Sequence, residues 1–313
     1  MNPPMPASPA PPSPAGGILP VFQTPFHDDE SIDFATLESE INWLFDQGSD
    51  GIVMAMVSET LRLSSEERDE LARAACELAR TRGQVVISVG AESTRVALRH
   101  ARHAEKSGAT ALMAIPPVAT GCDAPELLTY FRAILSETGI PLIVQDASGY
   151  VGRPLPIAML ADLLDEFGGD RVLFKPEATP IGPRLSALRD ATAGRAKVFE
   201  GSGGIALVDS FRRGIIGTMP GADLISAIVA LWIALNAGDE PRISRLGSLL
   251  TDMVSLQVGL DGFLAIEKYL LVKQGVFQSE QVRGPVGFRL DDETRREVDR
   301  RFDALMAAVR NET

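Results

Sequence analysis

The 313-residue sequence predicts an α/β protein, a single (β/α)8 TIM barrel with additional C-terminal helices. Three observations predict this fold. Short runs rich in Val and Ile alternate with amphipathic stretches, the alternation occurs eight times, and only helical patterns follow the eighth run. A doubly wound open sheet uses the same alternation and stays as an alternative, but eight units followed by helices favour the closed barrel.

The eight apolar runs place the strands at intervals that suit βα units. The predicted strands are residues 18–23, 51–56, 85–90, 111–115, 142–146, 172–175, 197–201 and 215–219. Ser64 and Glu67 form a capping-box pattern, so a helix is predicted to begin there, between the second and third strands. The later helices are predicted at residues 222–237, 242–260, 263–274 and 291–309, where we expect them to cap the barrel.

The chain divides into a tail and one folded domain. Residues 1–16 are almost wholly Pro, Ala and Ser, a composition that cannot bury enough apolar area to offset the entropy of ordering. This segment is therefore predicted to be a disordered tail. Residues 17–221 are expected to hold the barrel strands and their helices. Residues 222–313 are expected to hold the last barrel helix and a helical extension of the same domain.

Composition and net charge indicate which classes of binding partner are expected. The sequence is 45% hydrophobic and 23% charged, which is typical of a globular domain. Its net charge of −12 opposes binding to nucleic acid or an anionic membrane, so a small-molecule partner is favoured. The tail lacks the basic and apolar regions of a signal peptide, and no run approaches 18 apolar residues, so we expect a cytoplasmic location.

Working residues of such a barrel lie at the C-terminal ends of the strands and in the loops that follow. This rule selects residues 23–24, 57–59, 90–92, 116–120, 145–150, 175–177, 201–204 and 218–222. Within this set a lysine is conspicuous, because the whole chain contains only five.

Lys175 ends the apolar run 172–174, so its amine is expected to project into the barrel mouth. Burial disfavours the charged form of an amine, which makes it nucleophilic enough to condense with a carbonyl near neutral pH. The alternative is a structural ion pair with Glu177 or Glu200. Lys197 opens its strand and is expected to point toward the opposite, stability face of the barrel.

Other kinds of site have little support in the sequence. It contains no nucleotide-binding glycine motif, nucleophile elbow or metal-type histidine pair at a strand end, so no metal and no nucleotide cofactor is expected. His100 and His103 are better explained by a solvated helix face than by a metal site. The glycine-rich run 200–204 could hold a phosphate or pack closely. Cys76 and Cys122 are expected to be structural thiols.

Several motifs resemble one known family. The runs GILPVFQTPF at residues 17–26, GSDGIVMAMVSETLRLSSEER at 48–68 and FKPEAT at 174–179 resemble the dihydrodipicolinate synthase and N-acetylneuraminate lyase family, over about residues 17–310. The resemblance implies a class I aldolase barrel, usually a homotetramer, with no cofactor. It also implies that Lys175 forms an imine with pyruvate or a similar 2-oxo acid.

The departures from the family pattern are informative. After the second strand, the family's Gly-Thr-Thr-Gly-Glu is replaced by residues 55–59, in which only the acid Glu59 persists. The fifth-strand tyrosine that relays protons aligns with Gln145, and the fourth-strand Pro-Tyr-Tyr becomes residues 117–119, Pro-Val-Ala. An amide exchanges no proton near neutral pH, so Gln145 can position substrate but cannot act as acid or base.

The combination of Ser58-Glu59, Gln145-Asp146 and Phe174-Lys175-x-Glu177 resembles instead the branch that contains 2-keto-3-deoxy-L-arabonate dehydratase. That enzyme's polar segment in the first C-terminal helix corresponds to residues 255–257, which lack its histidine and acid. The resemblance implies Lys175, Gln145 and Ser58 as catalytic residues. The expected substrate-binding residues are Val57, Ser58, Glu59, Asp146, Glu177, Gly201 and Thr218.

Individual roles follow from this alignment. We expect Ser58 and nearby backbone N–H groups to bind the substrate carboxylate, and Gln145 to bind a hydroxyl or water. Glu59 either tunes the site or anchors its loop. Tyr150 is the only tyrosine expected near the mouth.

Three functions remain open at this point. The leading one is a dehydratase or aldolase for a 2-oxo-3-deoxy sugar acid. The others are dihydrodipicolinate synthase and a non-catalytic barrel that binds a 2-oxo acid.

Overall fold

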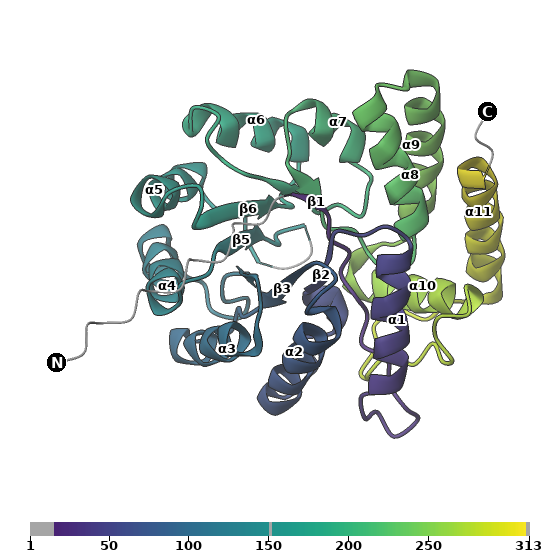
Figure 1. Cartoon of the computed structure of the whole chain (residues 1–313), viewed down its shortest axis with the longest axis horizontal. Coiled ribbons are helices and arrows are strands. Elements are labelled where there is room, and N and C mark those ends of the chain that lie inside the picture. Colours follow the sequence, from purple (N-terminus) through teal and green to yellow (C-terminus); the bar gives the residue numbers. More distant parts are fainter. Residues whose placement is uncertain (1–15, 150–151, 311–313) are drawn as a thin grey trace.

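The structure of the protein is a computed structural model that describes residues 16–149 and 152–310. Eight parallel strands surround a central core, and helices lie around them (Figure 1). The strands are β1 (Gly17–Ile18), β2 (Gly51–Met54), β3 (Gln84–Ser88), β4 (Ala111–Ala114), β5 (Leu142–Asp146), β6 (Val172–Pro176), β7 (Phe199–Glu200) and β8 (Gly217–Thr218). The predicted strand at residues 142–146 coincides with β5, whereas β1, β7 and β8 are shorter than predicted.

The strands close into a barrel through short links between two sheets. One sheet has the order β2-β3-β4-β5-β6 and the other the order β1-β8-β7. Single parallel bridges join them, between Val21 and Val53 on one side and between Phe174 and Val198 on the other. The predicted barrel is therefore confirmed, and the open doubly wound sheet is not found.

Helices cover the outer face of the strands. They are α1 (Phe34–Asp46), α2 (Ser65–Ala79), α3 (Thr94–Ser107), α4 (Ala124–Glu137), α5 (Ile157–Phe167), α6 (Ile181–Ala191), α7 (Leu207–Arg212) and α8 (Ile225–Ala237). The 3-10 helix η1 (Met56–Ser58) instead follows β2 directly. The capping box predicted for α2 is confirmed, because Glu67 N donates to Ser64 Oγ (3.2 Å) and Ser64 N donates to Glu67 Oε2 (2.8 Å).

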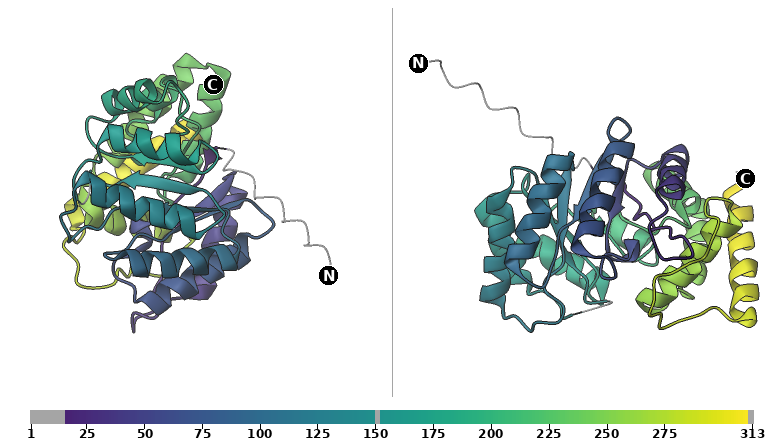
Figure 2. Two further views of the ribbon diagram at one scale, coloured as in Figure 1. Left: turned by 90° about the vertical axis from the view of Figure 1, so that its left-hand side faces the viewer. Right: turned by 90° about the horizontal axis from the view of Figure 1, so that it is seen from below.

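The remaining helices are α9 (Glu240–Val254), α10 (Gly259–Lys273) and α11 (Asp292–Arg310), and they gather on one side of the barrel (Figures 1 and 2). The predicted helix over residues 242–260 is wrong in its extent. Apolar residues continue through the break, but the chain turns between α9 and α10, and Gly259 has a φ of 68°. Leu260 therefore belongs to α10, which brings it to the barrel mouth.

No single helix in the described part of the chain is long and apolar enough to cross a membrane. The pair α9 and α10 satisfies length and composition together, but it is bent by 112°.

Two features of the core orient the side chains of β6. Leu173 packs inside the barrel, whereas Phe174 packs in the layer between the strands and the helices. Because side chains alternate along a strand, Lys175 returns to the inside. The same alternation on β5 places Ile143 inside, Val144 outside and Gln145 inside. Both polar side chains thus enter the barrel at the C-terminal ends of their strands.

Two of the predictions concern residues that the structure does not describe. Residues 1–15 of the predicted tail lie outside the described residues, and so does Tyr150.

Candidate active site

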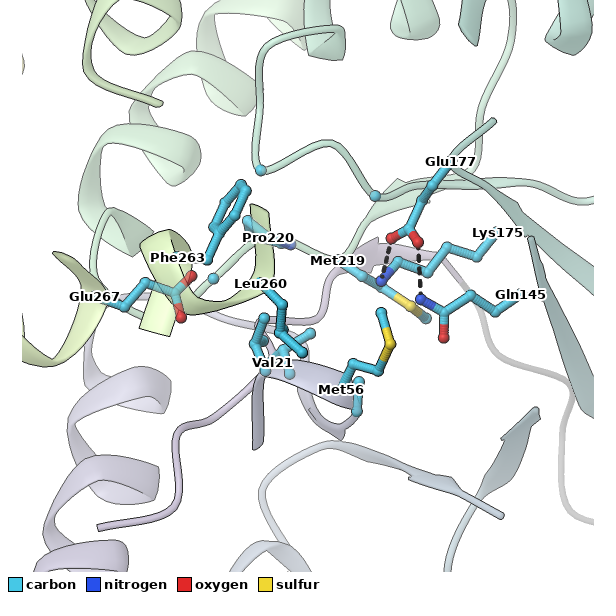
Figure 3. Close-up of a pocket in the computed structure, with 15 residues that line it drawn as sticks. Val21, Met56, Gln145, Lys175, Glu177, Met219, Pro220, Leu260, Phe263 and Glu267 are labelled. Atoms are coloured by element: carbon cyan, nitrogen blue, oxygen red, sulfur yellow. Dashed lines mark hydrogen bonds and ion pairs between the residues drawn. The ribbon is translucent and has the colours of Figure 1, made fainter. Parts of the chain in front are cut away.

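A pocket of about 410 Å³, open to solvent, lies at the C-terminal end of the barrel. Its lining comes from six of the eight strand ends or their following loops and from α10 (Figure 3). The lining residues are Val21, Ala55, Met56, Val57, Gln145, Lys175, Glu177, Gly201, Gly203, Met219, Pro220, Gly221, Leu260, Phe263 and Glu267. The wall is thus mostly apolar, and its polar side chains come from β5, from β6 and the residue after it, and from α10.

Lys175, Glu177 and Gln145 form the polar group at one wall (Figure 3). Lys175 Nζ lies 2.9 Å from Glu177 Oε1, and Gln145 Nε2 donates to Glu177 Oε2 at 2.9 Å. Lys175 is 3% exposed and Glu177 4% exposed. The register of the sheet explains the group, because Gln145 pairs with Lys175 across β5 and β6.

Burial and the neighbouring side chains have opposing effects on the pKa of Glu177, and burial has the largest. Burial raises the pKa of the Glu177 carboxyl, while the ammonium of Lys175 and the hydrogen bond from Gln145 oppose the rise. Glu200 adds to it by like-charge repulsion. Such a carboxyl can accept a proton from a neighbouring amine more readily than an exposed glutamate can.

Gly201 gives Lys175 its space. A methyl group at this position would collide with Lys175 Cε and lie 2.6 Å from Glu177 Oε1. Any larger residue would therefore displace the ion pair. Gly204 serves packing instead, since a methyl there would lie 2.6 Å from Leu250 and 2.9 Å from Ile228. Close packing thus explains the glycine-rich run without a phosphate.

Lys197 lies where its position in the strand predicted. It forms an ion pair with Asp170 (2.8 Å) and its side chain is 35% exposed, and it does not line the pocket. The two strand lysines therefore occupy opposite environments, as expected.

Of the three residues expected to bind substrate after β2, only one lines the pocket. Val57 lines the pocket, but the hydroxyl of Ser58 is held by backbone: it donates to Phe22 O (2.6 Å) and accepts from Ala55 N (3.1 Å). Glu59 is buried and pairs with Lys268 Nζ (2.5 Å). Of its two expected roles, the contacts of Glu59 favour anchoring the loop.

Asp146 and Thr218 also have structural partners. Asp146 accepts from Ser148 Oγ (2.6 Å), Leu155 N (2.9 Å) and Arg184 (3.2 Å), which ties Ser148, Leu155 and Arg184 to the end of β5. Thr218 Oγ1 donates to Glu200 Oε2 at 2.8 Å. Neither residue is part of the pocket lining.

The histidines expected on a solvated face are instead packed against α2, and that expectation is wrong for His100. It is 4% exposed, with Nδ1 2.7 Å from Asp69 Oδ1, and His103 Nε2 lies 2.8 Å from Asp69 O. Within the described ranges no cluster of histidine, cysteine and acidic side chains could hold a metal ion.

Glu267 is the principal lining residue that the sequence did not indicate. It lies on α10, is 1% exposed, and its Oε2 accepts a hydrogen bond from Gln23 Nε2. The available signal was a glutamate and a lysine in succession, Glu267 and Lys268, in the middle of a helix whose other charged residues lie in its first and last turns. Such charged residues at buried positions require partners or a function.

Comparison with known proteins agrees with this architecture. The model of the dihydrodipicolinate synthetase family matches residues 14–167. A 4-hydroxy-tetrahydrodipicolinate synthase from Azoarcus sp. (strain BH72) is 31% identical over 202 residues, which cover 61% of this chain and 69% of that protein. The chain belongs to the dihydrodipicolinate synthetase family.

A second relative matches over more of its length. The L-2-keto-3-deoxyarabonate dehydratase of Azospirillum brasilense is 28% identical over 301 residues, covering 93% of this chain and 95% of that protein. Among solved structures, the dihydrodipicolinate synthase of Rhodopseudomonas palustris has a TM-score of 0.84 at 24% identity, covering 93% and 98% of the two chains. This last likeness concerns the fold alone.

Family membership settles the class of protein. Members of this family are Schiff-base lyases that bind pyruvate or other small 2-oxo acids, and this chain is a lyase of the family. A non-catalytic barrel is therefore set aside.

Proposed function

We propose that this chain is a dehydratase that forms an imine between Lys175 and a 2-oxo-3-deoxy sugar acid. The observation that carries the proposal is the buried Lys175–Glu177 pair at 2.9 Å, open to the pocket, with Gln145 in place of a proton-relaying tyrosine. It is supported by the 28% identity with the Azospirillum dehydratase along nearly the whole chain.

The first step needs an uncharged amine. Glu177 takes a proton from the Lys175 ammonium, because burial raises the pKa of the Glu177 carboxyl. The free amine attacks C2 of the substrate, and Glu177 returns its proton to the C2 oxygen, which leaves as water. A protonated imine forms, and Glu177 is again a carboxylate. The substrate carboxylate is assigned to the backbone around Met56 and Val57, which lines the pocket, in preference to the hydroxyl of Ser58.

The second step removes a proton from C3. The protonated imine acidifies this carbon, and the Glu177 carboxylate is the base that lies beside it. The enamine that results expels the C4 hydroxyl and leaves a C3–C4 double bond. Gln145 positions Glu177 through its hydrogen bond and takes no proton itself.

Two measurements test the proposal. Borohydride added with pyruvate should reduce the imine and attach pyruvate permanently to Lys175, which peptide mass spectrometry would locate. Incubation with L-2-keto-3-deoxyarabonate should then give a 2-oxo semialdehyde. Free pyruvate and glycolaldehyde would instead identify an aldolase, and consumption of aspartate semialdehyde a synthase. Failure of the labelling would overturn the proposal entirely.

The remaining expectations belong to the same proposal. We infer that the enzyme uses no cofactor, since the imine itself supplies the electron sink, and that it acts in the cytoplasm as a homotetramer. Light scattering coupled to size-exclusion chromatography would measure the number of subunits.

A further inference from the structure

Three buried carboxyl groups meet beside the pocket, on the side away from Lys175. They are Glu40 of α1, Asp223 after β8 and Glu267 of α10, with exposures of 0%, 2% and 1%. In residues 16–149 and 152–310 none of the three forms an ion pair. A buried acid without a cation is costly unless it is protonated.

Two glutamines hold this carboxyl cluster in place. Gln23 donates to Glu267 Oε2 through its side chain and to Glu40 Oε1 through its backbone N–H (2.8 Å). Gln257 Nε2 donates to Asp223 Oδ2 at 2.8 Å. The amide groups bind both the neutral and the ionised forms of an acid, so the cluster can change protonation without losing its geometry.

Gly221 allows two of the acids to approach. A methyl group there would collide with Glu267 Oε1 and would lie 3.0 Å from Asp223 Oδ1. Both carboxyls therefore lie next to the backbone of Gly221, where there is no side chain. Two carboxyls that face the same point do not ionise independently, because the charge on one disfavours the charge on the other.

The electrostatic surroundings favour this proton. Burial raises the pKa of Glu267 well above its usual range, with further increases from Asp223 and Glu40, while Lys268 opposes them. Burial also raises the pKa of Asp223 to about 7. Lys268 is itself bound to Glu59, which limits its influence on the cluster.

Glu267 alone among the three lines the pocket, and it does so from the wall opposite Lys175 and Glu177 (Figure 3). The pocket therefore presents two carboxyls with different neighbours. Glu177 contacts an amine and an amide, whereas Glu267 contacts an amide and lies beside other acids. Pairs of titratable groups with such contrasting surroundings commonly divide acid and base roles.

We propose that Glu267 is the general acid that protonates the departing C4 hydroxyl, a role that rests on the proposed dehydratase function. The enamine electron pair forms the C3–C4 double bond as the C4–O bond breaks. The proton passes from the Glu267 carboxyl to the leaving oxygen, which departs as water. Glu267 becomes a carboxylate and regains a proton from solvent through the open pocket.

The test separates proton removal at C3 from loss of the hydroxyl. Pyruvate has no C4 hydroxyl, so its exchange of C3 hydrogen for deuterium, followed by NMR, needs Lys175 and Glu177 but not Glu267. In E267Q we expect exchange and borohydride labelling to stay within about threefold of the wild type. Dehydration of L-2-keto-3-deoxyarabonate should fall by about 10²-fold or more. The control E38Q makes the same change at an exposed position of α1 and should leave all three rates unchanged.

A second variant tests the protonation state. D223N removes a like-charge neighbour, so the pKa of Glu267 should fall and the alkaline limb of the dehydration rate should move to lower pH. E40Q should move it in the same direction by less. A merely structural cluster would not shift this limb.

The outcomes are distinct. Failure of labelling in the wild type would reject the proposed function itself. Normal labelling with an E267Q dehydration rate near that of the wild type, or an unmoved alkaline limb in D223N, would reject Glu267 as the acid. If E267Q does not fold, the D223N pH profile decides the question.

Discussion

Two lysines of this protein are almost completely buried, and their surroundings differ. Lys175 is 3% exposed and pairs with Glu177 at 2.9 Å, while Lys268 is 0% exposed and pairs with Glu59 at 2.5 Å. Lys268 also donates to Thr24 O (2.8 Å) and Gln281 O (2.7 Å), so all three of its N–H bonds have acceptors.

The comparison shows what distinguishes a reactive amine from a structural one. Burial and a carboxylate partner are common to both. Only Lys175 lines the pocket. Lys268 instead ties α10 to the loops after β1 and β2, and its ammonium lies 4.6 Å from the centre of the Phe26 ring. Burial lowers the pKa of Lys268, but Glu59 opposes this and favours the charged form.

The largest effect is expected from K175A. Without the amine no imine can form, so turnover of L-2-keto-3-deoxyarabonate should fall by at least about 10⁴-fold, and borohydride should attach no pyruvate. Rate assays and peptide mass spectrometry would measure both. Circular dichroism should show an intact fold, since removal of Lys175 leaves Glu177 free to hold a proton. Label found at Lys268 would contradict the division between the two lysines.

The next effect concerns stability. K268M removes the nearer of the two cations that pair with the buried Glu59 and leaves only Arg62, at 3.5 Å. The loss should lower the free energy of unfolding by about 3–5 kcal/mol. Urea denaturation would measure the loss. The double variant E59Q/K268M removes both charges and should recover part of it. Folded K268M should still be labelled by pyruvate and borohydride, and loss of labelling in folded protein would show that Lys268 takes part in the chemistry.

A smaller effect is expected from G201A. The added methyl group collides with Lys175 Cε, so the amine must move by a substantial fraction of an ångström. Misplacement on this scale should reduce the rate of imine formation by about 10²-fold. G121A is the matched control, because a methyl group at Gly121 meets no atom within 4 Å. A labelling rate in G201A equal to that of the wild type would contradict the inference that Lys175 needs the space left by Gly201.

The position of the reactive lysine could be predicted from the sequence. Val172, Leu173 and Phe174 form an apolar strand, and the period of two along a strand turns the following lysine inward at the end where barrel enzymes carry their sites. The same reasoning found Gln145 and Glu177. These residues are local to strands, so their positions follow from the pattern of the chain.

The rest depends on tertiary contacts. The strand-end rule gives the position of Ser58, Asp146 and Thr218 but not the direction of their side chains, which are bound by backbone or by neighbouring polar groups. Glu267 reaches the pocket because α10 folds back over the barrel mouth, and no local periodicity specifies that docking. Lys268 is buried for the same reason.

The smallest effect is expected from Q145L, which removes the amide that hydrogen-bonds to Glu177. The hydrogen bond from Gln145 lowers the pKa of Glu177, so its loss should raise that pKa further. Glu177 must be ionised to remove the C3 proton, and it is ionised only above its pKa. The acid limb of the deuterium exchange of pyruvate should therefore move to higher pH by about one unit, with a rate about tenfold lower on that limb. At pH values above the limb the rate should approach that of the wild type. An equal loss at every pH would mean that Gln145 acts on the substrate directly and not through Glu177.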